Sequence, residues 1–257
     1  MLYLIGMGLY DERDISLKGL DILKDSDRIY AEFYTNIFRG DIHKLKIAVG
    51  KEITVVGRED IEEKPGENIF RDPKIDVALL VPGDPMVATT HSNIILEAHK
   101  LGIKTRIIHA SSIYSAVSET GLQTYKFGKT TTIPFPQKNY FPTSPYHVLR
   151  DNLRTGLHTL LLLDVRAEDK HYMSIGEAAD IMLRMEEEIK DSVFKGDTFC
   201  VGVARLGGDQ VIKAGDVDEI KCCDFGKPPH ALIVPGRLHF MEKEMLELYR
   251  VDVIDHV

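Results

Sequence analysis

The chain has 257 residues, 44% hydrophobic and 28% charged, and its formal net charge is −8. This composition excludes a disordered chain and a fibre, and the negative charge argues against general nucleic-acid binding, which depends on neutralising phosphates. No apolar run approaches the roughly 18 residues of a membrane helix and no export signal opens the sequence, so we expect a soluble, cytoplasmic protein without a membrane partner.

Strands and helices alternate over the first part of the sequence, which is typical of a parallel sheet with helices on its faces. The run Asp76–Val81 is continuously apolar after its first residue and is expected to be buried on both faces. Ser16 is expected to cap a helix that has Leu17, Leu20 and Leu23 on one face. The other elements predicted here are strands at Met1–Ile5, Arg28–Tyr34, Lys51–Val56 and Lys104–His109 and a helix from Val87 to Gly102.

Beyond Ala110 the pattern changes, and strands follow one another as well as helices. The capping box Ser174–Glu177 predicts a long helix that runs to about Ile189. Threonine- and aromatic-rich runs at Thr124–Phe127 and Thr130–Phe135 predict two strands close enough to pair. The remaining predicted elements are helices at Ser112–Glu119, Pro145–Thr155 and Phe240–Arg250 and strands at His158–Val165, Thr198–Arg205, Gln210–Ala214 and Ala231–Val234.

The pattern as a whole predicts an α/β protein of two domains, 1–110 and 111–257, the first with a mostly parallel sheet and the second with a mixed sheet. The three cysteines, Cys200, Cys222 and Cys223, are an odd number and are expected to be reduced thiols. They lack zinc spacing, and the sequence has no C-x-x-C or H-x-x-x-H pattern, so no metal site is predicted.

Three loops stand where ligands bind in open α/β sheets, beyond the carboxyl ends of strands. They are Gly6–Leu9, Pro82–Pro85 and His109–Ile113, and Pro235-Gly236 after a later strand is a fourth candidate. Each alone is compatible with a simple connector, since Gly tolerates positive φ and Pro stiffens turns. Several such loops at one edge favour a shared ligand cleft.

A nicotinamide cofactor is one hypothesis for this cleft. Gly6-x-Gly8 follows a strand, and Glu32 lies where an acidic ribose ligand is expected. However, Asp11 occupies the position of the third glycine, and further carboxylates nearby would repel a pyrophosphate.

S-adenosylmethionine, which has no phosphate, is the second hypothesis. Asp84, between Gly83 and Pro85, is either an acceptor for such a ligand or a turn residue, and the residues alone leave both open. Spacing alone therefore predicts only a nucleotide-type ligand at this edge.

Several longer motifs resemble the archaeal-type diphthine synthases, a family of the tetrapyrrole methylase-like class. The motifs occur in family order over essentially the whole chain. They are Tyr10–Asp14, Ala31–Thr35, Pro82–Pro85 with Ala88–His91, Ser112–Ala116, Tyr125–Gly128, Phe141–Ser144, Gly156–Leu160 and Asp224–Gly226 leading to Pro228-Pro229-His230.

The resemblance implies a two-domain α/β methyltransferase, usually a homodimer, that holds S-adenosylmethionine between its domains. Such enzymes methylate the amino group of a 3-amino-3-carboxypropyl side chain on one histidine of translation elongation factor 2, and three transfers give diphthine, the precursor of diphthamide. S-adenosylhomocysteine is the second product. The cofactor-binding positions implied are Leu9, Asp84, Val87, Ser112, Ile113, Leu163, Leu206 and His230.

No catalytic residue is predicted, because an amine that is partly deprotonated near neutral pH makes a dedicated base optional. Polar candidates for contact with the target side chain are Tyr34, Thr35, His91, Tyr125 and Lys126, although packing or solvation is the favoured explanation for each. Tetrapyrrole methylation, nicotinamide-dependent oxidation and a nucleotide-binding module without catalysis remain the alternative functions.

Overall fold

The computed structural model describes residues 1–138, 140–166 and 169–251 and divides into two compact units. Unit 1 is Met1–Ala116 and unit 2 is Val117–Val257. The division falls after Ala116 and not at Ala110 as predicted. The segment after β5 (Thr105–Ile108), including α5 (Ile113–Ala116), is thus grouped with unit 1.

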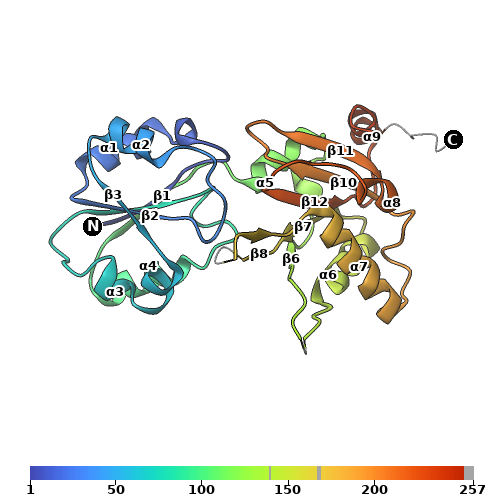
Figure 1. Ribbon diagram of the computed structural model, residues 1–257, viewed down its shortest axis with the longest axis horizontal. Helices are drawn as coiled ribbons and strands as arrows, with labels where there is room; N and C mark the ends of the chain where they lie inside the picture. Colours follow the sequence, from blue (N-terminus) through green and yellow to red (C-terminus); the bar gives the residue numbers. More distant parts are fainter. Residues whose placement is uncertain (139, 167–168, 252–257) are drawn as a thin grey trace. The chain divides into compact units, whose positions relative to one another are not determined.

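Unit 1 contains a parallel sheet of five strands in the order β3-β2-β4-β1-β5, with α1 and α2 on one face and α3 and α4 on the other (Figure 1). Each strand lies within the corresponding predicted run or overlaps it closely, so these predictions are confirmed. The other strands are β1 (Leu2–Gly6), β2 (Arg28–Glu32), β3 (Ile53–Val56) and β4 (Val77–Val81).

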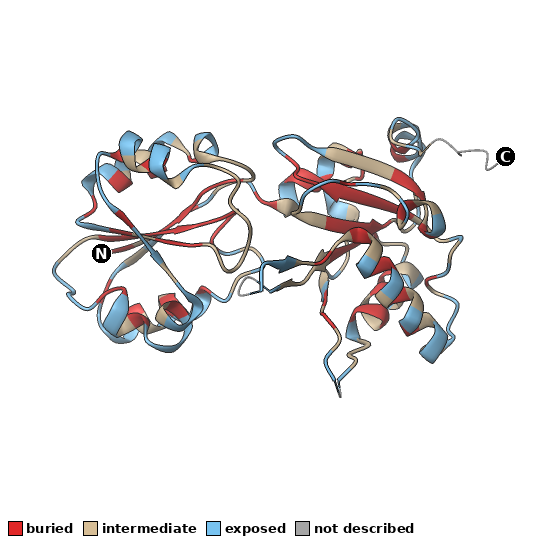
Figure 2. Ribbon diagram, in the orientation of Figure 1, coloured by how far each residue is buried: buried red, intermediate tan, exposed pale blue. Residues whose placement is uncertain are grey.

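All five residues of β4 are buried, as the apolar run predicts (Figure 2). Ala78 and Leu80 pack in the cluster that includes α1 and α2 residues, whereas Val77, Leu79 and Val81 pack in the cluster that includes η2 and α4 residues. This alternation follows from the two-residue period of a strand. The centre of the sheet is therefore covered on both sides, and ligand access is left to its ends.

The helices of unit 1 agree only in part with the sequence prediction. Ser16 caps α1, since its Oγ accepts from Gly19 N at 3.1 Å, but Leu17 is 81% exposed and so does not join the buried face. The helix expected from Val87 begins at Ser92, because Ala88 adopts φ 55° and interrupts a right-handed helix. The helical segments are η1 (Glu12–Asp14), α1 (Leu17–Asp25), α2 (Ile42–Val49), η2 (Glu59–Glu63), α3 (Pro65–Asn68), α4 (Ser92–Lys100) and α5 (Ile113–Ala116), of which η1, α2, η2 and α3 were not predicted.

Unit 2 contains a mixed five-stranded sheet in the order β11-β10-β12-β7-β6. Its pairs are antiparallel except β6–β7, so the predicted mixed sheet is confirmed. β8 and β9 form a separate two-stranded ribbon that follows β7. The strands are β6 (Thr131–Ile133), β7 (Thr159–Leu163), β8 (Val165–Arg166), β9 (His171–Tyr172), β10 (Phe199–Ala204), β11 (Val211–Asp216) and β12 (His230–Val234).

The core of unit 2 forms where α6, α7 and α8 pack on this sheet. The capping box at α7 is present: Glu177 N donates to Ser174 Oγ at 3.2 Å, and Ser174 N donates to Glu177 Oε2 at 2.8 Å. No helix within the described ranges is long and apolar enough to cross a bilayer. The helical segments are η3 (Val117–Thr120), η4 (Thr124–Lys126), α6 (Ser144–Arg154), α7 (Ile175–Ile189), α8 (Val217–Ile220) and α9 (Phe240–Glu247).

The strand predicted at Thr124–Phe127 is wrong, because this segment forms the short 3₁₀ helix η4. Gln123 N donates to Glu242 Oε1 at 2.9 Å, and Lys126 Nζ donates to the carbonyl of Arg237 at 2.7 Å. Contacts with distant parts of unit 2 thus fix a turn where local propensity favours a strand.

Candidate functional site

The loops that follow β4, β1 and β5 form one edge of unit 1, because these strands are adjacent and parallel. Gly8 N donates to the Gly83 carbonyl at 3.2 Å, and Gly83 N donates to the Gly8 carbonyl at 2.8 Å. The loop after β1 and the turn after β4 are therefore directly joined. We call the loops 6–10, 82–91 and 109–113 the unit 1 edge.

Two glycines allow these loops to pack closely. A Cβ on Gly6 would lie 2.6 Å from both the Cβ of Ala110 and the carbonyl oxygen of Gly83. Gly8 has φ +81°, and a Cβ there would collide with the side chain of Asp14. Close packing alone therefore explains why glycine is needed at both positions, and no phosphate ligand has to be invoked.

Asp84 is the central residue of the unit 1 edge. Its Oδ1 accepts from Met86 N at 2.9 Å, and its Oδ2 accepts from Ala110 N at 3.1 Å and from His109 Nδ1 at 2.8 Å. Asp84 is only 5% exposed, whereas the side chain of His109 is 70% exposed. The carboxylate therefore organises the turn and the loop after β5, and it positions an accessible imidazole.

The structure brings five of the predicted cofactor residues together at this edge. Val87 N donates to the Asp84 carbonyl at 3.1 Å, which closes the turn after β4. Ser112 is buried, and its carbonyl accepts from Ala116 N at 3.0 Å at the start of α5. Leu9, Val87 and Ile113 are partly exposed, so they offer apolar surface beside these polar groups.

Glu32 and His91 form a second feature of the same end of the sheet, and both side chains are completely buried. Glu32 Oε2 accepts from Tyr34 N at 3.0 Å and from Thr35 N at 3.1 Å. His91 Nδ1 donates to the Pro85 carbonyl at 3.2 Å. His91 Nε2 lies 3.7 Å from Glu32 Oε1 and has no hydrogen-bond partner.

Burial raises the pKa of Glu32 to about 7 and lowers the pKa of His91. The sequence did not reveal this pair, because the two residues are far apart in the chain. A buried Glu32 that already accepts two backbone N–H groups does not present its carboxylate to a ribose, which counts against the nicotinamide hypothesis.

The three predicted cofactor residues of unit 2 share one end of its sheet, which we call the unit 2 edge. His230 opens β12 and pairs with Ala204 at the end of β10, just before Leu206. On the other side, Ala231 pairs with Leu162, next to Leu163 at the end of β7. The antiparallel register thus brings together positions that the sequence separates by up to 67 residues (230 − 163).

Arg205 braces the loop that leads to His230. Its guanidinium donates to the Phe225 carbonyl at 2.6 Å and to the Lys227 carbonyl, and its backbone N donates to the Pro229 carbonyl at 3.0 Å. Both ring nitrogens of His230 are buried without a hydrogen-bond partner. Because buried polar atoms are normally paired, these nitrogens indicate a position where a ligand can supply partners.

The five candidates for contact with the target side chain have different surroundings. His91 and Thr35 belong to the buried Glu32 cluster, and Lys126 is bound to Glu242 and to a backbone carbonyl. Tyr125 is 79% exposed, and its hydroxyl donates to Gln123. A packing role therefore accounts for most of this set.

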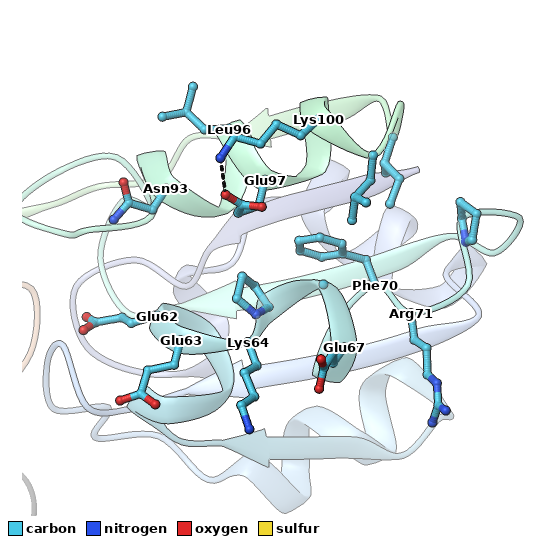
Figure 3. A pocket seen from close by; sticks show the side chains of 15 residues that line it. Glu62, Glu63, Lys64, Glu67, Phe70, Arg71, Asn93, Leu96, Glu97 and Lys100 are labelled. Carbon is cyan, nitrogen blue, oxygen red and sulfur yellow. Dashed lines mark hydrogen bonds and ion pairs between the residues drawn. The ribbon is translucent and has the colours of Figure 1, made fainter.

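A cavity of about 750 Å³ opens elsewhere on unit 1, among η2, α3 and α4 (Figure 3). Charged side chains such as Lys64 and Glu67 line it, together with the ion pair Glu97–Lys100. It contains none of the predicted cofactor residues. Within residues 1–138, 140–166 and 169–251, no group of three or more metal-ligating side chains gathers at one point.

Comparison with known proteins agrees with the fold. The chain matches the tetrapyrrole (corrin/porphyrin) methylase family over residues 1–221. It therefore belongs to this family and is an α/β methyltransferase, so the predicted fold class and enzyme class are confirmed.

Within this family the chain is similar to diphthine synthases over nearly its whole length. It is 47% identical over 249 residues to the diphthine synthase of Methanococcus maripaludis strain C7, covering 96% of this chain and 98% of that protein. It is 46% identical over 251 residues to the diphthine synthase of Methanocaldococcus jannaschii, and the match covers 96% of this chain and 98% of that protein. A crystal structure of a diphthine synthase matches it with a TM-score of 0.88 at 40% identity, covering 97% of this chain and 95% of that one.

Proposed function

We propose that this protein is an S-adenosylmethionine-dependent N-methyltransferase that makes diphthine on translation elongation factor 2. Its target is the amino group of a 3-amino-3-carboxypropyl side chain on one histidine, and three methyl transfers complete the product, a step in diphthamide biosynthesis. The observation that carries the proposal is identity of 46–47% to diphthine synthases over 96% of the chain.

The two sheet edges suit the methyl donor. We assign cofactor binding to Leu9, Asp84, Val87, Ser112 and Ile113 at the unit 1 edge and to Leu163, Leu206 and His230 at the unit 2 edge. The unpaired ring nitrogens of His230 offer polar contacts, and the part-exposed leucine, valine and isoleucine side chains offer apolar ones. Asp84, whose carboxylate already accepts three hydrogen bonds, contributes by holding the loops of the unit 1 edge in place. When bound, S-adenosylmethionine supplies an electrophilic methyl group and leaves as neutral S-adenosylhomocysteine.

Positioning is the main catalytic contribution that we assign to the chain. A neutral leaving group develops no anion that requires an oxyanion hole. Holding donor and acceptor in line supplies roughly 7–11 kcal/mol of the barrier reduction. Loops that are hydrogen-bonded to one another, such as those of Gly8 and Gly83, provide the rigidity that in-line geometry needs.

The proposal includes the setting in which the enzyme works. Its substrate is a folded protein of the translation machinery, so we place the enzyme in the cytoplasm and assign it neither a nucleic-acid nor a membrane partner. We also propose a homodimer, as the family resemblance implies.

Mass spectrometry tests the proposal directly. The protein is incubated with S-adenosylmethionine and elongation factor 2 that carries the aminocarboxypropyl group. We expect mass increments of successive methyl groups on the peptide with the modified histidine, and none on elongation factor 2 that lacks the side chain. No mass gain with an otherwise intact substrate would overturn the proposal.

Methylation of a tetrapyrrole is the second candidate, since the matching family is described by corrin and porphyrin substrates. Offering a tetrapyrrole precursor and modified elongation factor 2 in one reaction separates the two functions. We expect methyl groups on the protein alone, and faster methylation of the tetrapyrrole would select the alternative.

A further inference from the structure

Methylation of an amine releases one proton in each transfer. The amine of an amino-acid side chain is largely protonated near neutral pH, and a protonated nitrogen has no lone pair to attack a methyl carbon. Conversion of an ammonium to its trimethylated form therefore removes three protons, one per transfer. A side chain that accepts these protons at the site speeds the reaction where the free amine is scarce.

His109 has the position that this role requires. It follows β5 directly, within the loop that holds Ser112 and Ile113, and its Nδ1 lies 2.8 Å from Asp84 Oδ2. The two side chains differ in environment, since that of Asp84 is 6% exposed and that of His109 is 70% exposed. The imidazole thus rests on a buried carboxylate while most of the ring remains accessible.

The contact with Asp84 determines which ring nitrogen can accept a proton. An ionised carboxylate only accepts hydrogen bonds, so Nδ1 of His109 carries the hydrogen, and Nε2 presents its lone pair. Asp84 is itself held by Met86 N and Ala110 N, at 2.9 and 3.1 Å. A fixed carboxylate behind an imidazole orients the ring and selects its tautomer.

His91 and His230, the other histidines of the two edges, lack this combination of support and access. His171 has an accessible ring bound to Glu177 at 3.0 Å, but it belongs to the β8–β9 ribbon. His91 is completely buried, and its Nε2 faces Glu32. The ring nitrogens of His230 are buried, and the structure shows no carboxylate bound to them. His158 lies at the opposite end of β7 from Leu163 and is also buried, with Nδ1 accepting from Gly236 N and Nε2 bound to Glu242.

We propose that His109, oriented by Asp84, is the proton acceptor for the target amine. This inference rests on the proposed function. His109 Nε2 takes a proton from the ammonium, whose nitrogen keeps the electron pair of the broken N–H bond. That pair forms the new N–CH₃ bond as the S–CH₃ bond breaks with its electrons remaining on sulfur. The exposed imidazolium then releases its proton to water, which restores the base for the next transfer.

A pH profile of His109→Gln tests this role, because glutamine keeps a donor for Asp84 but accepts no proton near neutral pH. With saturating S-adenosylmethionine, we expect kcat at pH 6.5 to fall about 100-fold, within the usual range for loss of a general base. The deficit should shrink as the pH rises through the pKa of the amine itself. Added imidazole should restore part of the activity at pH 6.5. The affinity for S-adenosylhomocysteine and the thermal midpoint should stay close to those of the wild type.

His99→Gln is the matched control, since His99 is an exposed histidine on α4 of the same unit. It should keep the wild-type profile. A His109→Gln variant with wild-type kcat at every pH, or one whose loss is the same at all pH values and unaffected by imidazole, would overturn the inference. A wild-type protein that transfers no methyl group would instead overturn the proposed function, so the two failures are distinguishable.

Discussion

Glu32 Oε1 and His91 Nε2 lie 3.7 Å apart in a part of unit 1 that is closed to solvent. Because Nδ1 of His91 donates to the Pro85 carbonyl, Nε2 directs a lone pair toward the carboxyl group. Two acceptors face each other most favourably when one holds a proton, in keeping with a Glu32 pKa near 7. The pair connects the end of β2 to the turn that carries Asp84.

This relationship predicts an unusual pH dependence of stability. Burial raises the pKa of Glu32 from 4.5 to about 7. Between pH 4.5 and pH 7, Glu32 is therefore protonated in the folded protein and ionised in the unfolded chain. The free energy of unfolding therefore falls as the pH rises from 4.5 to 7, by about 3 kcal/mol from this group. Relative to wild type, Glu32→Gln should become more stable by about 2–3 kcal/mol between pH 5 and pH 8.

Urea unfolding at the two pH values measures this difference. The lowered pKa of His91 works in the opposite direction, because its contribution increases with pH up to about 6.5 and is shared by both proteins, so it largely cancels in the comparison. An identical pH dependence in wild type and variant would contradict the assignment.

Asp84→Ala should weaken binding of S-adenosylhomocysteine at least about tenfold while unit 1 remains folded. The substitution leaves Met86 N and Ala110 N without their acceptor, at about 1–3 kcal/mol for each unsatisfied group, and it releases two loops of the unit 1 edge. Titration calorimetry measures the affinity. Asp72→Ala is the control, because Asp72 accepts one exposed backbone hydrogen bond, from Lys74 N. Equal affinities for wild type and Asp84→Ala would reject the role of Asp84.

Gly8→Ala and Gly50→Ala should differ although both glycines have positive φ, +81° and +74°. Alanine at position 50 meets open space and should cost only the backbone penalty of about 1–2 kcal/mol. Alanine at position 8 also collides with Asp14, so it should destabilise unit 1 further and weaken cofactor binding. Thermal unfolding measures the loss of stability, and calorimetry measures the loss of cofactor affinity. If both variants lose the same amount of stability, the collision with Asp14 costs nothing and the prediction is wrong.

Glu242 is a buried carboxylate of unit 2 that accepts four hydrogen bonds. Burial alone raises its pKa, but hydrogen bonds from His239 N, Lys126, Gln123 N and His158 outweigh burial and lower the pKa to about 2. Stability from this group is therefore present above pH 4.5 and is lost as the pH falls toward 2.

Glu242→Gln should lower the free energy of unfolding at pH 7 by about 3 kcal/mol and flatten its decrease in acid. Denaturant unfolding between pH 3 and pH 7 tests both effects. Glu244→Gln, on the exposed side of the same helix, should leave the acid dependence unchanged. If both variants behave alike, the contacts of Glu242 contribute no more than a surface charge.

Much of the fold could be predicted because its signals are local. The apolar run of β4 and the capping box of α7 each identify an element within a few residues. Helix α2 was missed although Asp41 caps its start and Gly50 ends it in a left-handed conformation, so the signals were present but short. The segment Thr124–Phe127 failed for the opposite reason, since its bonds to Glu242 and Arg237 depend on residues more than 100 positions away.

The candidate site likewise combines features that have a local sequence signal with features that depend on residues far apart in the chain. Glycine loops after strands located the unit 1 edge, and topology explains why they meet. The contact between Asp84 and His109 joins residues 25 positions apart, and no sequence period predicts it. Likewise, the grouping of Leu163, Leu206 and His230 follows from the pairing of β7, β12 and β10, which the sequence alone does not specify.

The reciprocal hydrogen bonds between Gly8 and Gly83 have a consequence for protein engineering. Because each turn completes the backbone bonding of the other, a change in the length of one displaces its neighbour. Transplanting ligand preference from a related methylase therefore requires exchanging both turns at once, whereas a single-turn chimera should lose binding to either ligand.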